Sequence, residues 1–439
     1  MGARPTLRTL GDAESYLSEL VNLERVQGFD YETLGLARIE ALLEAVGRPE
    51  RELRAIHIAG SKGKGSVALA TECLLRAAGR RVGTYTSPHL ESWRERFRVD
   101  GAPVRPERLV GALERLRPGV ERQRRDPQRC PSFFDVSTAL AFLLFRDAGV
   151  DAAVVEVGLG GRLDSTNVLH PRVTVVTSIE LEHTDKLGTT LGAIATEKAG
   201  ILEPGTPALH GRLPVEAWAA LAARAVALDV DLEEVAEREA SAGPDALRVT
   251  LADGRELQAP LLGAHQARNL ALAVRASEHF LGRALRAREL GALGRLELPA
   301  RLERVGGLIL DVAHTPGSAR ALRETLEGLW PERRWVLVLS LSRDKDAAAI
   351  LKELAGPTRR AFLSVGEPAR ALDSGVLEAL AWAQGIGEVE IEAVPARALA
   401  AARRAQGPED LIVVAGSVYL AGAIRARLRA EGRIPGPSL

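Results

Sequence analysis

The stretch Arg54-Ala-Ile-His-Ile-Ala-Gly-Ser-Lys-Gly-Lys-Gly-Ser-Val-Ala-Leu-Ala70 decides the architecture of this chain. Its apolar run over 55–59 predicts a buried strand. A glycine-rich loop follows, and the Ala- and Leu-rich segment 67–78 then predicts a helix that stops at Gly79. Strand, glycine-rich loop and helix in this order are typical of a phosphate-binding loop, because backbone N–H groups and the helix N-terminus both attract an anion.

The loop departs from the usual phosphate-loop pattern at one position. Gly65 separates Lys64 from the hydroxyl of Ser66, whereas the pattern has Ser or Thr directly after the lysine. Lys64 is expected to reach the outer phosphates as a point charge. A glycine-rich turn without a ligand is the alternative. The candidates for holding a nucleotide here are Gly60, Ser61, Lys62, Gly63, Lys64, Gly65 and Ser66.

Length and composition limit the classes of protein to which this chain can belong. Its 439 residues predict two or three domains, and its formal net charge of zero favours neither nucleic acid nor an anionic membrane as a partner. No apolar run approaches the length of a membrane span, and the polar segment 1–20 is unlike a secretory signal. The two cysteines cannot form a disulfide framework, which fits a reducing cytoplasm.

Lysine is scarce in this chain, because arginine supplies nearly all of the positive charge. The lysines are confined to six positions, and four of them lie in the stretches that we assign to nucleotide and metal. A lysine retained in an arginine-rich chain suggests a chemical need that arginine does not meet. The six positions are Lys62, Lys64, Lys186, Lys198, Lys345 and Lys352.

Three polar side chains are expected at one edge of the predicted parallel sheet. Glu156 lies near the end of the apolar run 152–158, and Ser87 and His183 follow the strands predicted before and after it. Ligands bind at the carboxyl ends of the strands in open α/β sheets, and Mg²⁺ prefers oxygen ligands. These residues are therefore candidate metal ligands, with His183 the least expected of them. The alternatives are a simple turn at Ser87, a helix-capping role for Glu156 and a structural role for His183.

Further candidates lie in the same part of the chain. Phe133 and Phe134 open a predicted helix and belong either to the core or to an apolar wall for a ring-shaped substrate. The Asp253-Gly254 pair between two short apolar runs predicts a β-hairpin. His265 and Asn269 share one face of a predicted helix, where they receive a nucleotide base or cap local backbone.

A second α/β alternation begins after the linker candidate 296–301. Its first strand ends in Asp311-Val-Ala-His314, and its last strand ends in Gly416-Ser417, so both loops are expected to face the same side of a sheet. The predicted strands are Gly307–Leu310, Trp335–Leu341, Ala361–Val365, Glu388–Ile391 and Leu411–Ala415.

These motifs together resemble the folylpolyglutamate synthase/dihydrofolate synthase family of the Mur ligase superfamily, from about residue 20 to the C-terminus. The resemblance also accounts for Gly65, since the family loop has that insertion. It implies an α/β fold with a P-loop-type ATPase domain at 1–297, built on a mainly parallel sheet with a small hairpin region, and a Rossmann-like domain at 298–439. The motifs are Gly-Ser-Lys-Gly-Lys-Gly-Ser (60–66), Thr-Ser-Pro-His-Leu (86–90), Glu-Val-Gly-Leu-Gly-Gly-Arg-Leu-Asp-Ser-Thr-Asn (156–167), Glu-Lys-Ala-Gly-Ile (197–201), Gly-Ala-His-Gln (263–266) and Asp-Val-Ala-His (311–314).

The resemblance implies an ATP-dependent ligase that adds L-glutamate to a folate or dihydropteroate carboxylate through an acyl phosphate. It implies two magnesium sites, with Lys198 carbamylated by carbon dioxide into an anionic ligand, which arginine could not become because it keeps its proton. The implied roles are catalytic for Lys64, Lys198 and His314; nucleotide-binding for the 60–66 loop, Asn269, Arg301 and Asp311; metal-binding for Ser87, Glu156, His183 and Lys198; and substrate-binding for Phe134, Asp164, His314 and Ser417.

Several choices stay open at this point. The chain departs from the family pattern at Ser61-Lys62, where Thr-Asn is usual, and at Glu182, where Asp is usual. One alternative is a peptidoglycan-type Mur ligase acting on a nucleotide-sugar substrate, and another is an ATP-binding module without catalysis. Within the family, dihydrofolate synthesis, polyglutamate extension or both are possible, and we expect both. We expect a cytoplasmic monomer with small-molecule substrates, and neither nucleic acid nor membrane as a partner.

Overall fold

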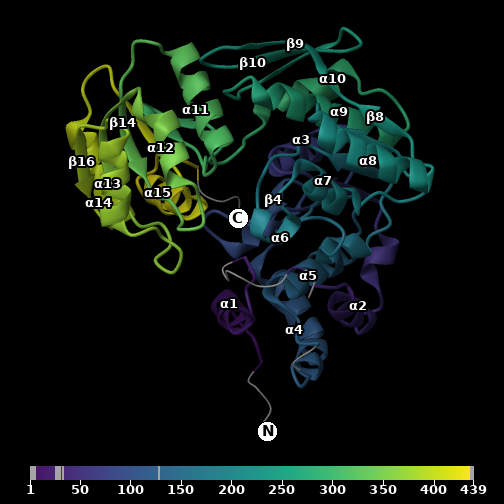
Figure 1. The fold of residues 1–439 in the computed structure, drawn as a ribbon. Coiled ribbons are helices and arrows are strands. Elements are labelled where there is room, and N and C mark those ends of the chain that lie inside the picture. The colour runs from purple at the N-terminus through teal and green to yellow at the C-terminus, as the bar shows by residue number, and fades with distance from the viewer. Residues whose placement is uncertain (1–5, 25–30, 32–33, 127–128, 436–439) are drawn as a thin grey trace.

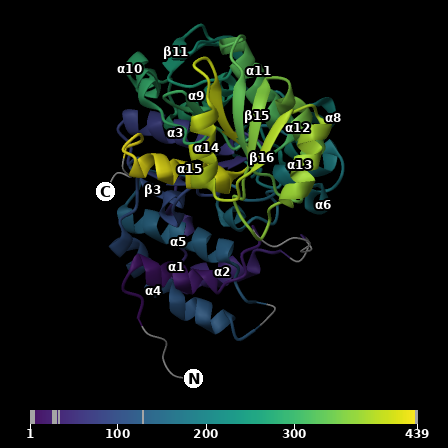
Figure 2. The same cartoon turned by 90° about the vertical axis from the view of Figure 1, so that its left-hand side faces the viewer.

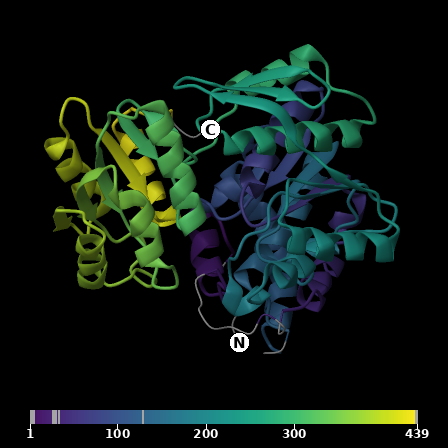
Figure 3. The same ribbon diagram turned by 45° about the horizontal axis from the view of Figure 1, so that its top comes forward.

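The computed structural model describes residues 6–24, 31, 34–126 and 129–435. Two sheets, each covered by helices, form two bodies that lie side by side (Figures 1 and 3). None of the helices in these ranges combines the length and apolar character that crossing a lipid bilayer would need.

The first sheet has eight strands in the order β4-β3-β2-β5-β1-β6-β7-β8. The six neighbouring strands β2-β5-β1-β6-β7-β8 are parallel. The strands β3 and β4 add an antiparallel edge next to β2, which the sequence did not predict. β1 occupies an interior position, as expected for an apolar run in a parallel sheet. The strands are β1 (Ala55–Ala59), β2 (Val82–Tyr85), β3 (Phe97–Val99), β4 (Ala102–Pro103), β5 (Ala152–Glu156), β6 (Val173–Val176), β7 (Ala208–His210) and β8 (Leu232–Glu234).

Helices cover both faces of this sheet, because alternate strand residues point to opposite sides. Ile56 and Ile58 pack with α3 and α9, whereas Ala55 packs on the other side with α5 and the N-terminal helices. Figure 2 shows α3 and α9 apart from α5, α1 and α2. The helices of this part are α1 (Leu10–Ser18), α2 (Ala37–Glu44), α3 (Lys64–Ala77), α4 (Pro106–Gln123), α5 (Phe133–Ala148), α6 (Thr184–Leu187), α7 (Leu191–Ala199), α8 (Val215–Leu228), α9 (His265–Leu281) and α10 (Ala287–Leu290), with 3-10 turns η2 (Pro49–Glu52), η3 (Trp93–Arg96), η4 (Ser165–Val168) and η5 (Gly291–Arg295).

The predicted hairpin is confirmed and belongs to a small three-stranded sheet. β10 (Leu247–Leu251) pairs antiparallel with β11 (Glu256–Ala259), and β9 (Glu237–Ala242) pairs with β10 on its other side. Apolar residues of this sheet pack against α9 in the same core as α3. The hairpin region therefore extends the core of the first sheet.

The second sheet has the order β12-β13-β17-β14-β15-β16 and is parallel apart from β12. All five strands predicted for this half are present; two have the predicted bounds, and the bounds of the other three differ by up to three residues. Helices α11 to α13 cover one face, and α14 and α15 cover the other. The elements are β12 (Glu303–Val305), β13 (Leu308–Leu310), α11 (Pro316–Leu329), β14 (Trp335–Leu339), α12 (Ala347–Ala355), β15 (Thr358–Leu363), α13 (Ser374–Ala383), β16 (Glu388–Ile391), α14 (Pro395–Ala405), β17 (Leu411–Ala415) and α15 (Val418–Ala430).

Helix α15 of the second body contacts the loop after β2 of the first. The Glu91 carboxylate accepts hydrogen bonds from the guanidinium groups of Arg425, at 2.5 Å, and Arg429, at 2.9 Å. Gly422 lies so close to Leu90 that a Cβ there would overlap the Leu90 carbonyl oxygen. This contact fixes the second sheet beside the strand-end loop that includes Ser87.

Candidate active site

One cavity of about 820 Å³ is lined by strand-end loops of both sheets. Residues more than 350 positions apart in the sequence meet there, because the carboxyl ends of parallel strands gather at one edge of each sheet. All site residues that the family resemblance implies line this cavity, namely Gly60, Ser61, Lys62, Gly63, Lys64, Gly65, Ser66, Ser87, Phe134, Glu156, Asp164, His183, Lys198, Asn269, Arg301, Asp311, His314 and Ser417. Their individual roles stay predictions.

The glycine-rich loop is held by the strand end next to it. Backbone N–H groups of Ser61 and Lys62 donate to the carbonyl oxygen and the hydroxyl of Ser178, at 2.7 and 2.9 Å. Gly63 caps the N-terminus of α3 with φ +85°, a left-handed conformation that favours glycine. The Lys64 ammonium donates to the Gly60 carbonyl oxygen at 2.8 Å. A fixed loop at the start of a 14-residue helix is a suitable cradle for phosphate groups.

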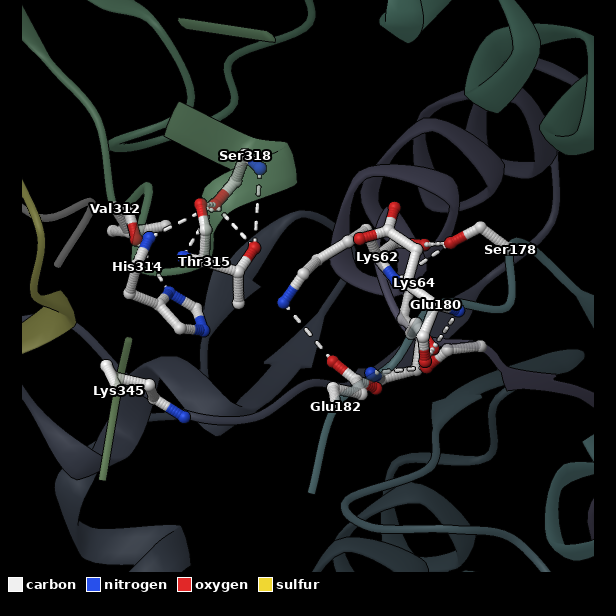
Figure 4. A network of polar contacts seen from close by, with 12 residues as sticks. Lys62, Lys64, Ser178, Glu180, Glu182, Val312, His314, Thr315, Ser318 and Lys345 are labelled. Carbon is white, nitrogen blue, oxygen red and sulfur yellow. Dashed lines mark hydrogen bonds and ion pairs between the residues drawn. The ribbon is translucent and has the colours of Figure 1, made fainter. Parts of the chain in front are cut away.

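Glu182 contacts two lysines that line the cavity with it, and Figure 4 shows its contact with Lys62. Its carboxylate oxygens lie 3.2 Å from both the Lys62 and the Lys198 ammonium groups, and Lys198 also donates to the Gly60 carbonyl oxygen at 3.1 Å. Burial lowers the pKa of Lys198 to about 8, although Glu182 opposes that shift. Burial alone would raise the pKa of Glu182, but Lys198 and Lys62 hold it well below its ordinary value.

Sequence reasoning did not place Glu182 among the site residues. The available signal was an acid directly before His183, in the loop that follows a strand. Sequence reasoning also did not place Lys345 among the site residues. Lys345 lines the cavity from the second body, on the side that faces Lys62 (Figure 4). The scarcity of lysine in the chain was the signal that could have identified it.

The candidate metal ligands present one carboxylate to the cavity. Glu156 is 4% exposed, and its Oε2 accepts a hydrogen bond from the Ser87 backbone N–H at 3.0 Å. Burial raises the pKa of Glu156, and the nearby Lys64 ammonium opposes that shift. Within the described residues, no group of three or more His, Cys, Asp or Glu side chains lies close enough to hold a metal ion. A cation beside Glu156 and the Ser87 hydroxyl would therefore need oxygen ligands from a bound phosphate or water.

Three candidates for nucleotide contacts line the same cavity as the loop. The Asn269 amide packs against Gly63 and donates to Gln266 Oε1 at 2.9 Å. Asp311 accepts hydrogen bonds from the backbone N–H groups of Leu302, at 2.8 Å, and Ala313, at 2.7 Å. Burial raises the pKa of Asp311, and the Arg301 guanidinium nearby opposes that shift.

His314 and Ser417 come from the second body and are already engaged by the chain. Burial lowers the pKa of His314, so its neutral imidazole donates from Nδ1 to the Val312 carbonyl oxygen at 2.7 Å and leaves Nε2 as an acceptor. The Ser417 hydroxyl caps α15 by accepting from the Tyr419 and Leu420 N–H groups. A helix cap is therefore the structural alternative to a substrate contact at Ser417.

The two adjacent phenylalanines have different surroundings. Phe133 belongs to the core, whereas Phe134 is only partly buried and lines the cavity. The Phe134 ring covers Gly158, where a Cβ would overlap it. Asp164 lies in the same wall, is 4% exposed, and accepts hydrogen bonds from Leu159 and Thr166. An aromatic face beside a buried carboxylate can hold a flat ring that carries amino groups.

Comparison with known proteins gives consistent similarities. Residues 294–418 match the family model described as Mur ligase, glutamate ligase domain. The chain is 38% identical over 379 residues to a dihydrofolate synthase/folylpolyglutamate synthase of Mycobacterium tuberculosis, which covers 80% of this chain and 77% of that protein.

Solved structures agree over nearly the whole chain. The M. tuberculosis folylpolyglutamate synthase complexed with ADP and AMPPCP has a TM-score of 0.88 and 34% identity, and the match covers 98% of this chain and 99% of that one. E. coli FolC in complex with DHPP and ADP has a TM-score of 0.84 and 28% identity, with coverage of 98% and 100%.

Proposed function

Because the chain belongs to the folylpolyglutamate synthase/dihydrofolate synthase family of Mur ligases, we propose that it joins L-glutamate to a carboxylate of dihydropteroate or a reduced folate with ATP as co-substrate. The chain is an enzyme, a ligase of the acid–amino-acid type. The observation that supports this proposal most is the single cavity where the phosphate-loop lysine, Glu156 and the Phe134 wall meet loops of the second body.

The proposed reaction has two steps. The substrate carboxylate attacks the γ-phosphorus of ATP, so that a C–O–P bond forms and ADP leaves. The amino group of glutamate then attacks the acyl carbon, an amide forms, inorganic phosphate leaves and the amine loses its proton to solvent or to a nearby base. We assign the phosphates to Lys64, Lys62 and the loop N–H groups, because these cations and dipoles neutralise charge that develops on the phosphate oxygens.

Magnesium fits the donor set of this site. Glu156 and the Ser87 hydroxyl supply oxygen atoms, and the phosphates of a bound nucleotide would complete the coordination. When bound, the ion neutralises phosphate charge and orients the transferring group. His183 and Lys198 are the proposed ligands of a second site. Lys198 is suited to carbamylation because its lowered pKa leaves part of the amine unprotonated near pH 8.

We also propose a separate role for each of the two bodies. We assign 1–297 to ATP binding, with Asn269, Arg301 and Asp311 around the nucleotide, although Arg301 and Asp311 lie beyond that boundary. We assign 298–439 to the second domain, with His314 and Ser417 near glutamate and the reacting phosphate. Closure of two domains over the acyl phosphate would exclude water. Phe134 and Asp164 are the proposed pterin contacts, and we propose a cytoplasmic monomer.

The purified enzyme tests this function directly. Dihydropteroate and tetrahydrofolate are each incubated with ATP, Mg²⁺ and L-glutamate, and phosphate release and product mass are measured. We expect glutamate-dependent phosphate release with both substrates, each product being heavier by one glutamyl residue, with further additions to tetrahydrofolate. Phosphate release without glutamate dependence, or none with either substrate, would refute the proposal. A UDP-sugar peptide serves as the control acceptor.

A further inference from the structure

His57 is a polar residue in the interior of the first sheet. It is fully buried in β1, between Val155 of β5 and Thr174 of β6. The other members of β1 are alanine and isoleucine, so a histidine there is costly unless its ring is hydrogen-bonded. Its Nε2 lies 2.8 Å from the Thr166 hydroxyl, in the turn η4 that follows the 158–161 loop.

The direction of the hydrogen bonds is fixed by chemistry. The Asp164 carboxylate accepts from the Thr166 backbone N–H at 3.0 Å and from the Thr166 hydroxyl at 2.5 Å. A hydroxyl has one proton, so once Thr166 donates it to Asp164, its oxygen must accept from His57 Nε2–H. Within the described chain, His57 Nδ1 has no hydrogen-bond partner, which fits the tautomer that leaves Nδ1 without a proton. Burial lowers the pKa of His57 to about 3, which keeps the ring neutral.

The chain of hydrogen bonds ends at the wall of the cavity. Asp164 also accepts from the Leu159 N–H at 2.8 Å and so holds the loop that packs against Phe134. Of the three hydrogen-bonded side chains, His57 and Thr166 are fully buried, while Asp164 lines the cavity. The arrangement links a central strand to a carboxylate that lines the cavity.

We propose that His57 is a positioning residue for the pterin substrate, which acts through Thr166 to hold the Asp164 carboxylate in the orientation that accepts from the amino groups of the ring. This inference rests on the proposed function, since it requires a pterin beside Asp164. His57 touches neither nucleotide nor substrate. Its loss should therefore weaken pterin recognition much more than ATP binding, although β1 leads directly into the phosphate loop.

The test compares variants that remove or keep the N–H and O–H donors. His57→Leu and Thr166→Val remove them, whereas His57→Gln and Thr166→Ser keep a donor near the same place. Thr84→Val is the matched control, because Thr84 is also fully buried and its hydroxyl has no partner among the described residues. The readouts are KM for dihydropteroate and for ATP, kcat, and thermal unfolding.

We expect His57→Leu and Thr166→Val each to raise KM for dihydropteroate about tenfold, a change of ~1.4 kcal/mol, with KM for ATP within about twofold of wild type. For the conservative variants, KM for dihydropteroate and KM for ATP should both stay within about threefold of wild type. The double variant His57→Leu/Thr166→Val should have a KM for dihydropteroate no higher than that of the single variants, because both substitutions break the same series of hydrogen bonds.

Two results would overturn the inference. One is an equal rise in KM for ATP and dihydropteroate, which indicates general damage to the loop; the other is an unchanged KM for dihydropteroate in Thr166→Val. If His57→Leu fails to fold, Thr166→Val decides alone. A wild-type enzyme that turns over no pterin substrate refutes the proposed function together with this inference, whereas normal wild-type turnover with an unaffected Thr166→Val refutes the inference only.

Discussion

Replacing Gly63 by alanine changes two things at once in the phosphate-binding loop. The residue has φ +85°, which an alanine adopts only at a cost. A Cβ there would also overlap the Asn269 Oδ1, with Asn269 Cγ at 3.1 Å and Nδ2 at 3.2 Å. The whole Asn269 amide must therefore move, and it would lose its hydrogen bond to Gln266.

The magnitude follows from these two effects. A left-handed conformation costs an L-residue ~1–2 kcal/mol, and loss of one side-chain hydrogen bond adds ~1 kcal/mol. We therefore expect Gly63→Ala to lower the free energy of unfolding by about 2–3 kcal/mol. Because the loop and Asn269 are both proposed to hold the nucleotide, Kd for ATP should rise at least tenfold, which corresponds to ~1.4 kcal/mol.

Gly79→Ala is the matched control for this experiment. Gly79 follows the same helix at its other end with φ +81°, but a Cβ there meets no atom within 4 Å. It should lose only the backbone contribution of ~1–2 kcal/mol and keep Kd for ATP within about twofold. Urea unfolding measures stability, and isothermal titration with Mg²⁺-ATP measures affinity.

Gly63→Ala combined with Asn269→Ala separates the steric effect from the backbone effect. Removing the Asn269 side chain makes room for the new methyl group, so the stability losses of the two single variants should not add. If Gly63→Ala resembled Gly79→Ala in both stability and ATP affinity, the reasoning about the loop and Asn269 would be wrong.

Three other predictions concern Lys198 and the contact between the two bodies. Lys198→Ala should lose most activity and regain part of it with added acetate or propionate; full activity in the untreated variant would contradict the carbamate proposal. Since the pKa of Lys198 is about 8, the neutral fraction of its amine should rise from about a tenth at pH 7 to about a half at pH 8. Incorporation of ¹³CO₂ at Lys198, followed by NMR at constant CO₂ pressure, should therefore increase over that range. A flat or falling signal would argue against carbamylation of the neutral amine. Glu91→Gln should destabilise the packing of α15 by about 1.5–3 kcal/mol in low salt, because it weakens the hydrogen bonds from Arg425 and Arg429; a change below about 0.5 kcal/mol in urea unfolding would show that the contact is not stabilising.

The sequence predicted the parts of the site that depend on local pattern. Apolar periodicity and glycine positions depend on the nearby backbone, so they predicted several elements of the site. These are the 60–66 loop, the strands that end at Glu156 and before His183, and the helix that contains Lys198. Contacts between distant segments were not readable. Glu182 meets Lys62 across 120 positions, and which of Phe133 and Phe134 faces the cavity depends on how α5 is rotated on the sheet.

By itself, the sequence determined that this chain builds two α/β units with a phosphate-binding loop, and its motifs determined the family. The reason is that strand, loop and helix propensities act over a few residues and leave a regular pattern. Only the tertiary structure decided the pairing of Glu182 with two lysines and the hydrogen bonds from His57 through Thr166 to Asp164. These contacts depend on strand order and on how the loops at the strand ends pack within the first body, and a hydrogen bond or an ion pair forms only when that packing brings two groups within about 3 Å.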